Sequence, residues 1–250
     1  MIPFLDQPNP ALSWTLASLA VIIIGIAKTG FGGGVGIVAV PMFVVAMGSR
    51  PGLGTLLPLL IAADVLSVYH HWGTWDRRNL IFLLPGSLLG ILVGSFIIGS
   101  INPRALELVI GSICILYLPV EYIRTRFAPA WHFRPNAPAG TSAGFLAGVA
   151  TTLAHAAGPV ITIYLLGQNL LKQTFLGTAV SYFFIINLIK LIPYTTLGLI
   201  QTNTLYIGLW LLPLVPVGTF IGSRLARRIP EKPFRRIILT ILFLTSCQLI

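Results

Sequence analysis

The chain has few charged residues, and few of those are acidic. Of its 250 residues only 9% are Asp, Glu, Lys or Arg, whereas about 25% is usual for a soluble domain, and 56% are hydrophobic. This composition, with a mean hydropathy of +0.90, excludes an ordinary soluble domain and indicates a polytopic membrane protein. The formal net charge is +10, but no soluble basic domain is present to bind nucleic acid, so we expect no nucleic-acid partner.

Cysteine and the motifs of metal and phosphate chemistry are also scarce. The two cysteines, Cys114 and Cys247, lie in apolar segments, and two thiols make neither a metal cluster nor a disulfide framework. Neither an H-E-x-x-H helix nor a phosphate-binding P-loop occurs. His70 and His71 stand beside two tryptophans, which favours an interfacial belt over a metal site. We therefore expect no enzyme, no cofactor and no bound metal.

What the chain does have is a series of apolar segments, ten in all, bounded by Gly, Pro, Asn and charged residues. Three of them, 34–48, 140–154 and 157–170, are shorter than the roughly 20 residues that a helix needs to cross the hydrocarbon core. They predict half-helices, re-entrant hairpins or short tilted spans. The other segments are 11–27, 53–72, 80–99, 104–123, 174–198, 203–225 and 233–250. The predicted fold class is an all-α polytopic membrane protein.

The segments divide five and five around a polar linker, 124–138, which separates a first repeat, 1–123, from a second repeat, 139–250. Without gaps, three sets of positions align in the same order: Ala27-Lys28-Thr29 with Ala150-Thr151-Thr152, Gly32-Gly33-Gly34 with His155-Ala156-Ala157, and Asp64 with Asn187. This order predicts an internal duplication, and chance similarity between apolar segments is the alternative.

Loop charge predicts the orientation of the two halves. In the first half the loop 73–79 is basic and the loop 100–104 carries only Arg104, whereas in the second half the equivalent of 73–79 has no base and the equivalent of 100–104 has many. By the positive-inside rule the repeats are therefore inverted, with broken or re-entrant helices at the centre. The cytoplasm then contains the loop 73–79, the linker and the loop 224–233. Both termini lie on the non-cytoplasmic side of the membrane.

The stretch KTGFGGGVGIVAVP, from Lys28 to Pro41, contains five glycines, each of which weakens a helix by about 1 kcal/mol. At membrane depth such irregular backbone is tolerated only where protein buries it or a cavity adjoins it. The tract indicates either a substrate site at helix ends or close glycine packing between helices. In the first case a half-helix beginning near Gly34 or Val35 presents its N–H groups to an anion, and the candidate binding residues are Lys28, Thr29, Gly32, Gly33 and Gly34.

The aligned stretch of the second half, Thr151 to Pro159, begins a helix in the same way, since Pro159 suits a first turn. Its candidate substrate-binding residues are Thr151, Thr152, His155 and Gly158. Each set has a structural alternative: Lys28 can snorkel to the membrane boundary, Thr29 can bond to its own helix, and His155 can be a packing residue.

Two charged residues lie in the middle of apolar segments, Asp64 in 53–72 and Lys190 in 174–198. Ionisable groups at such positions usually face the interior or a water-filled path. The repeat offset brings them together across the pseudo-twofold axis, where they form either a pair that titrates or opens during transport or a static structural pair. We take Asp64 and Lys190 as candidate coupling groups.

The motif AKTGFGGGVGIVAVP, followed by LPGSLLGILVGSFI and a second-half copy, resembles the sulfite exporter TauE/SafE family of membrane permeases. The resemblance implies transport of small anions, such as sulfite, sulfonates or related organosulfur compounds, across the bacterial inner membrane. We therefore expect a secondary transporter that works by alternating access with possible proton coupling. The alternatives are a passive anion channel, or a carrier or membrane enzyme for another small solute. Gly86, Gly90 and Gly94 offer a small-residue surface that serves either a homodimer or packing within the chain.

Overall fold

The computed structural model describes residues 9–30, 37–127, 136–225 and 231–250. These residues form eleven α-helices and no strand, which confirms the all-α class. In chain order the helices are α1 (Pro10–Gly30), α2 (Ala39–Met47), α3 (Ser49–His70), α4 (Arg77–Ser100), α5 (Pro103–Phe127), α6 (Ala137–Ala154), α7 (Gly158–Leu166), α8 (Lys172–Thr196), α9 (Thr202–Leu211), α10 (Leu214–Leu225) and α11 (Glu231–Cys247).

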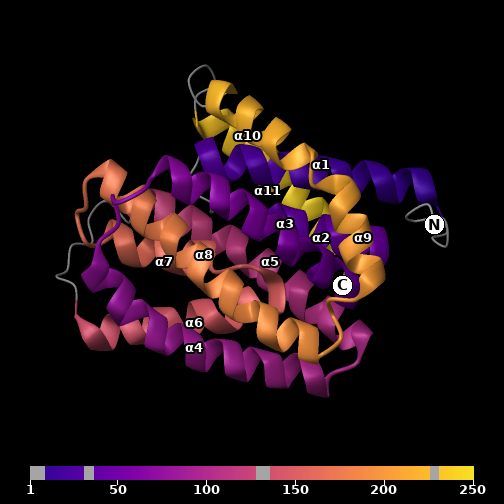
Figure 1. The fold of residues 1–250 in the computed structure, drawn as a ribbon, viewed down its shortest axis with the longest axis horizontal. Coiled ribbons are helices and arrows are strands. Elements are labelled where there is room, and N and C mark those ends of the chain that lie inside the picture. Colours follow the sequence, from indigo (N-terminus) through magenta and orange to yellow (C-terminus); the bar gives the residue numbers. More distant parts are fainter. Residues whose placement is uncertain (1–8, 31–36, 128–135, 226–230) are drawn as a thin grey trace.

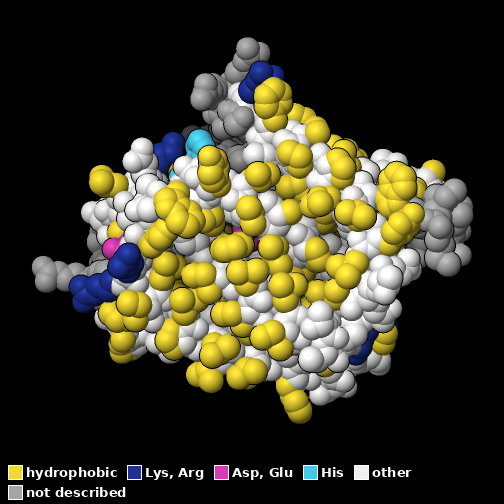
Figure 2. All heavy atoms as spheres, in the orientation of Figure 1, with side chains coloured by type: hydrophobic (Ala, Val, Ile, Leu, Met, Phe, Trp, Pro, Cys, Tyr) yellow, Lys and Arg dark blue, Asp and Glu magenta, His cyan; other side chains and the backbone are white. Residues whose placement is uncertain are grey.

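Within the described ranges, five helices are long and apolar enough to cross a membrane: α1, α3, α4, α5 and α8. The bent pair of α9 and α10 is a sixth candidate. By contrast, α2 and α7 have 9 residues each and rise only about 14 Å, too little to span the core, as two of the three short segments predict. The third short segment, 140–154, belongs to α6, which is longer, with 18 residues. Figure 2 shows hydrophobic side chains over most of one face, with Lys, Arg and His along its edges, most of them on the left and at the top. The chain is a multi-pass membrane protein.

The segment 203–225, expected as one unit, is divided into two helices. The axes of α9 and α10 differ by 43° at the break between Leu211 and Leu214. Pro213 explains the break, because its ring has no N–H to donate and clashes with the carbonyl one turn earlier. Pro85, in contrast, lies inside the continuous helix α4.

Glycines bring helices from the two halves of the chain into backbone contact. A Cβ atom at Gly90 would lie 2.8 Å from the Val149 backbone nitrogen, so α4 and α6 touch along this face. In the same way a Cβ atom at Gly25 would lie 2.8 Å from the Gly218 Cα atom, which joins α1 to α10. Gly86 and Gly94 also face α6, so the small-residue surface of α4 serves packing within the chain.

The helix ends lie on two opposite sides of the molecule in Figure 1. The turns between α4 and α5 and between α8 and α9 lie on the right, whereas the turns between α3 and α4 and between α7 and α8 lie on the left. Helices α3 and α8 run through the middle and pack against each other. The polar side chains buried on these two helices therefore lie in the interior of the bundle.

Candidate functional site

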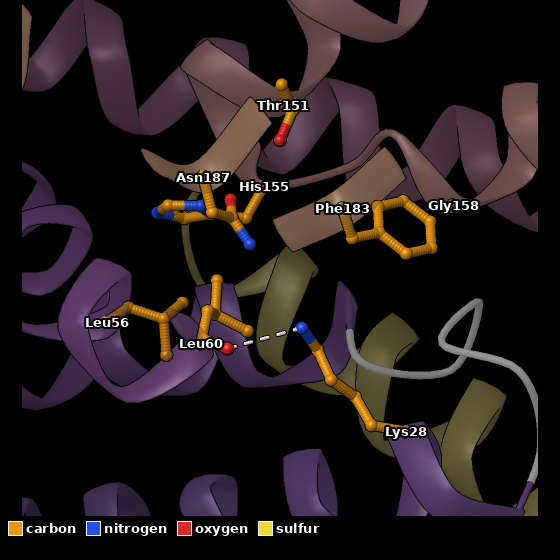
Figure 3. Close-up of a pocket in the computed structure, with 8 residues that line it drawn as sticks. All are labelled: Lys28, Leu56, Leu60, Thr151, His155, Gly158, Phe183 and Asn187. Atoms are coloured by element: carbon orange, nitrogen blue, oxygen red, sulfur yellow. Dashed lines mark hydrogen bonds between the residues drawn. The ribbon is translucent and has the colours of Figure 1, made fainter. Parts of the chain in front are cut away.

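The first component of the site is Lys28, in the last turn of α1. Its side chain is only 9% exposed and points from α1 toward α3, where its ammonium group forms an ion pair with Asp64 Oδ1. The same Nζ atom donates to the Leu60 carbonyl oxygen at 3.4 Å, the bond drawn in Figure 3. Lys28 therefore turns inward to a partner on α3 and does not snorkel to the membrane boundary.

Asp64 connects three helices. Its side chain is fully buried in α3, and its second oxygen, Oδ2, accepts a hydrogen bond of 2.6 Å from Asn187 Nδ2 on α8. With Lys28 on the first oxygen, the carboxylate is held by one charged donor and one neutral donor. Because carboxylate bonds to a charged donor are the stronger kind, any change at Lys28 or Asp64 alters the contact between α1 and α3.

The second component is the connection between α6 and α7. Helix α6 ends at Ala154, and His155 adopts the left-handed conformation with φ of 47°, uncommon for a residue with a side chain. The His155 N–H donates to the Thr151 carbonyl at 2.9 Å, which closes the helix end. Helix α7 then begins at Gly158, and Pro159 occupies its first turn, where no N–H is required.

Lys190 holds this connection from α8. It is fully buried, and its ammonium group donates to the Thr151 carbonyl oxygen (3.1 Å), to Thr151 Oγ1 (2.9 Å) and to His155 Nδ1 (2.9 Å). A lysine ammonium only donates, so His155 Nδ1 accepts and the ring proton is assigned to Nε2, which donates to the Leu53 carbonyl at 3.3 Å. His155 therefore links α3 with α8 as a neutral imidazole.

A small cavity lies between these two components, shown in Figure 3. Its volume is about 30 Å³, and a buried water molecule needs roughly 10–15 Å³, so this space accommodates one or two water-sized groups. Polar and apolar side chains share the wall, which is made by Lys28, Leu56, Leu60, Thr151, His155, Gly158, Phe183 and Asn187. The cavity thus has an ammonium group, a hydroxyl, an imidazole, an amide and the start of α7 around it.

The comparisons identify the family. The sequence model of the sulfite exporter TauE/SafE family matches residues 17–249. The chain belongs to this family. No curated protein and no solved structure matches the chain. Membership of the TauE/SafE family, together with the apolar helices, makes a membrane permease of sulfite-exporter type the coarse functional assignment.

One pentapeptide of this TauE/SafE chain has the spacing of a hydrolase motif that the sequence reasoning missed. Gly140 to Gly144, GTSAG, matches the Gly-x-Ser-x-Gly nucleophile elbow, which requires a sharp turn between a strand and a helix. Here the five residues lie inside α6, and Cβ atoms at Gly140 and Gly144 would meet Phe82 and Leu83 of α4. The two glycines therefore serve helix packing.

The structure brings together four of the predicted binding residues, Lys28, Thr151, His155 and Gly158, around the cavity. Thr152 lies apart from it: its Oγ1 donates to the Gly148 carbonyl at 2.8 Å, and its side chain packs against Gly94. Three of the remaining candidates, Gly32, Gly33 and Gly34, lie outside the described residues, as does the side chain of Thr29. The expected half-helix start near Gly34 or Val35 is also outside them, and α2 begins at Ala39.

The partner of Asp64 differs from the expectation. Within the described part of the chain, Asp64 forms its ion pair with Lys28, and no ion pair joins Asp64 to Lys190. The reason is that Lys28, at the end of α1, comes within direct reach of α3, whereas Lys190 reaches the end of α6 on the other side of the cavity. The sequence reasoning also left Asn187 and Phe183 out of the site. Asn187 had a signal, its alignment with Asp64, and Phe183 had none.

Proposed function

We propose that the chain is a secondary transporter of small anions, such as sulfite or a sulfonate, and that the cavity between Lys28 and Thr151 is its binding site. The observation that carries this proposal is the convergence of a buried ammonium, a hydroxyl and the N-terminal end of α7 on one cavity. The N-terminus of a helix and a buried cation both favour negative charge. An anion permease of the TauE/SafE family needs such a site.

Helix packing supports an inverted-repeat organisation. The first long helix of each half packs along the fourth segment of the other half, α1 along α10 and α6 along α4. Helix α3 likewise packs against α8, its counterpart in the second half, and α5 packs against α11. Such reciprocal pairing is what a pseudo-twofold axis between two repeats, 1–123 and 139–250, would produce. The two helix breaks are then the central elements of the site.

Transport then proceeds by alternating access across the bacterial inner membrane. Loop charge favours a cytoplasmic position for 73–79, 124–138 and 224–233, with both termini on the outer side. The cavity is too small for a tetrahedral or pyramidal anion of four or more heavy atoms, so binding requires it to widen. Opening of the Lys28–Asp64 pair provides such a change, because it frees the ammonium group that points into the cavity.

Asp64 is then the proton-coupling group, and Lys190 supports it from the other side. Protonation of Asp64 removes the negative charge that competes with the substrate for Lys28, so one proton and one anion enter the site together. The Asn187 amide bonds to Asp64 in the ionised form and keeps the carboxylate in place. Lys190 carries a second positive charge beside Thr151 and His155.

Anion flux into proteoliposomes tests this function. We expect uptake of radiolabelled sulfite or methanesulfonate to saturate. Anion on the opposite side of the membrane should stimulate this uptake, and an inward proton gradient should change its rate. Asp64→Asn should abolish the pH dependence of flux, Lys190→Met should weaken it, and Glu107→Gln at the exposed Arg104 pair should leave it unchanged. Flux that rises linearly with concentration and shows no trans-stimulation would favour a passive channel, and chemical conversion of the solute would favour an enzyme.

A further inference from the structure

Helix α3 makes two polar contacts, one beyond each end of its cavity-lining stretch. Near the start of the helix, the Leu53 carbonyl oxygen accepts a hydrogen bond of 3.3 Å from His155 Nε2. Three turns later, Asp64 forms its ion pair with Lys28. At 1.5 Å per residue these two positions on α3 lie about 16 Å apart along the helix axis. Between them lie the two residues of α3 that line the cavity, Leu56 and Leu60.

The contact at Leu53 lies toward the side of the molecule that carries the turn between α8 and α9, here the α8–α9 side. Arg50, at the start of α3, donates from Nη2 to the Ile98 carbonyl oxygen at 2.9 Å, near the end of α4. A Cβ atom at Gly54 would lie 2.6 Å from the carbonyl carbon of Leu199, in the α8–α9 turn. The start of α3 is therefore packed against this turn, on the right in Figure 1. The other contact lies toward the opposite side, the α3–α4 side, where α3 leads into α4.

His155 lies at the α8–α9 side of the cavity. Its imidazole lines the cavity and also meets the ring of Tyr194 edge-on, with the two ring centroids 5.7 Å apart. Tyr194 is fully buried two residues before the end of α8, and its hydroxyl donates to the Thr152 carbonyl at 2.7 Å. Contacts with α3 and with the end of α8 therefore hold the imidazole between the cavity and the α8–α9 turn.

We propose that the hydrogen bond between His155 and Leu53 closes the cavity toward the α8–α9 side. The pair of Lys28 and Asp64 closes it toward the α3–α4 side. The inference rests on transport through this cavity, which is part of the proposed function, and adds the two routes by which a substrate enters and leaves. A single hydrogen bond contributes little net free energy, because water replaces the lost partner, so the His155 contact can break and re-form during transport. When it breaks, the connection between α6 and α7 separates from α3, and the substrate passes between them.

A cysteine in the cavity wall measures which side is open. Leu56→Cys is the reporter, in a chain whose own cysteines are replaced by Cys114→Ala and Cys247→Ser. Sealed membrane vesicles receive a charged methanethiosulfonate reagent, which does not cross the bilayer, on one side at a time. In separate chains, exposed positions identify the two sides: Asn203→Cys at the start of α9 and Gln173→Cys at the start of α8. We expect slow labelling of the reporter from both sides while both contacts are in place.

One variant opens each side. Asparagine tolerates the left-handed backbone conformation of His155 and has a shorter side chain, so His155→Asn removes the contact with α3 and keeps the turn. It should raise the labelling rate at least tenfold from the α8–α9 side and leave the rate from the other side unchanged. Lys28→Met should do the reverse. Lys172→Gln, at an exposed position of α8, is the control and should change neither rate.

Three results would overturn the inference. The first is unchanged labelling from the expected side in either variant. The second is an equal rise from both sides in a variant that keeps the Tm of the reporter chain. The third is labelling of the reporter, with His155 and Lys28 in place, as fast as that of Asn203→Cys, and this measurement stands even if a variant fails to fold.

The outcomes separate this inference from the proposed function. Side-specific opening without stabilisation by sulfite, methanesulfonate or chloride in a thermal-shift experiment refutes the anion site and leaves the two closures in place. Stabilisation by these anions without side-specific opening leaves the anion site in place and refutes only the closures.

Discussion

Substitution of Gly86 by alanine tests the packing that holds α6, and with it half of the site, in place. A Cβ atom at Gly86 would lie 2.7 Å from the Thr141 carbonyl carbon and 2.8 Å from the Phe145 backbone nitrogen, closer than real Cβ contacts come. Both obstacles are backbone and cannot rotate away, so α4 and α6 must separate. Overpacking costs about 1–3 kcal/mol, and we expect the upper end here. Alanine also has a helix propensity about 1 kcal/mol better than that of glycine, which leaves a net loss of about 2 kcal/mol.

The assay is thermal unfolding of the purified protein in detergent. For a chain of this size a loss of about 2 kcal/mol corresponds to a fall in Tm of about 4–8 °C. Gly99→Ala is the matched control in the same helix, because a Cβ atom there meets only the flexible end of Leu197 at 3.3 Å. It should leave Tm unchanged or raise it slightly. If the Gly86 variant were as stable as this control, the close contact of α4 with α6 in this register would be wrong.

Three further substitutions test single contacts. Asn187→Leu removes the donor to Asp64 Oδ2 and leaves a buried carboxylate oxygen unpaired, so the free energy of unfolding should fall by about 2–3 kcal/mol. Tyr194→Phe removes the 2.7 Å hydrogen bond to the Thr152 carbonyl, and we expect the free energy of unfolding to fall by about 1 kcal/mol. A free energy of unfolding that is unchanged within error would argue against that contact. Outside the spanning helices, partial burial and the adjacent histidine lower the pKa of His71. Neutral His71 therefore contributes to the stability of the folded protein above about pH 6.5, and this contribution is lost as the pH falls through the lowered pKa. Replacing His71 with Gln should flatten the dependence of Tm on pH below that point.

Hydrophobic pattern and glycine content predicted ten apolar segments, whereas the described residues form eleven helices. The short segments 34–48 and 157–170 became the short helices α2 and α7, because length alone decides whether a helix can span the core. The break between α9 and α10 was missed, although Pro213 is visible in the sequence. Proline breaks some apolar helices and not others, as Pro85 in α4 shows, and the outcome depends on whether neighbours hold the chain straight.

Partners across the bundle were harder to predict than helices. The sequence places Asp64 and Lys190 in the middle of their segments, and it gives no rotation about either helix axis. Asp64 was expected to face Lys190, but the ammonium within reach is that of Lys28, which sits beside the glycine tract on another helix. Thr152 shows the same limit: it is adjacent to Thr151 in the chain, yet one hydroxyl contacts Lys190 and the other its own helix. Neighbouring residues on a helix point about 100° apart, so only the packing decides which one faces the site.

Positions 28 and 151, which the proposed repeat aligns, each take part in a contact between a lysine and a neighbouring helix. In the first half a lysine on α1 donates to α3, and in the second half a lysine on α8 donates back to α6, so in each half a lysine joins the first helix to the third. In the proposed alignment, position 28 is the lysine donor in one half, and position 151 is the threonine that accepts from Lys190 in the other. Only the first bridge contains a carboxylate, that of Asp64. The two bridges therefore differ in kind, because the first joins a lysine to a carboxylate and the second joins a lysine to uncharged acceptors only.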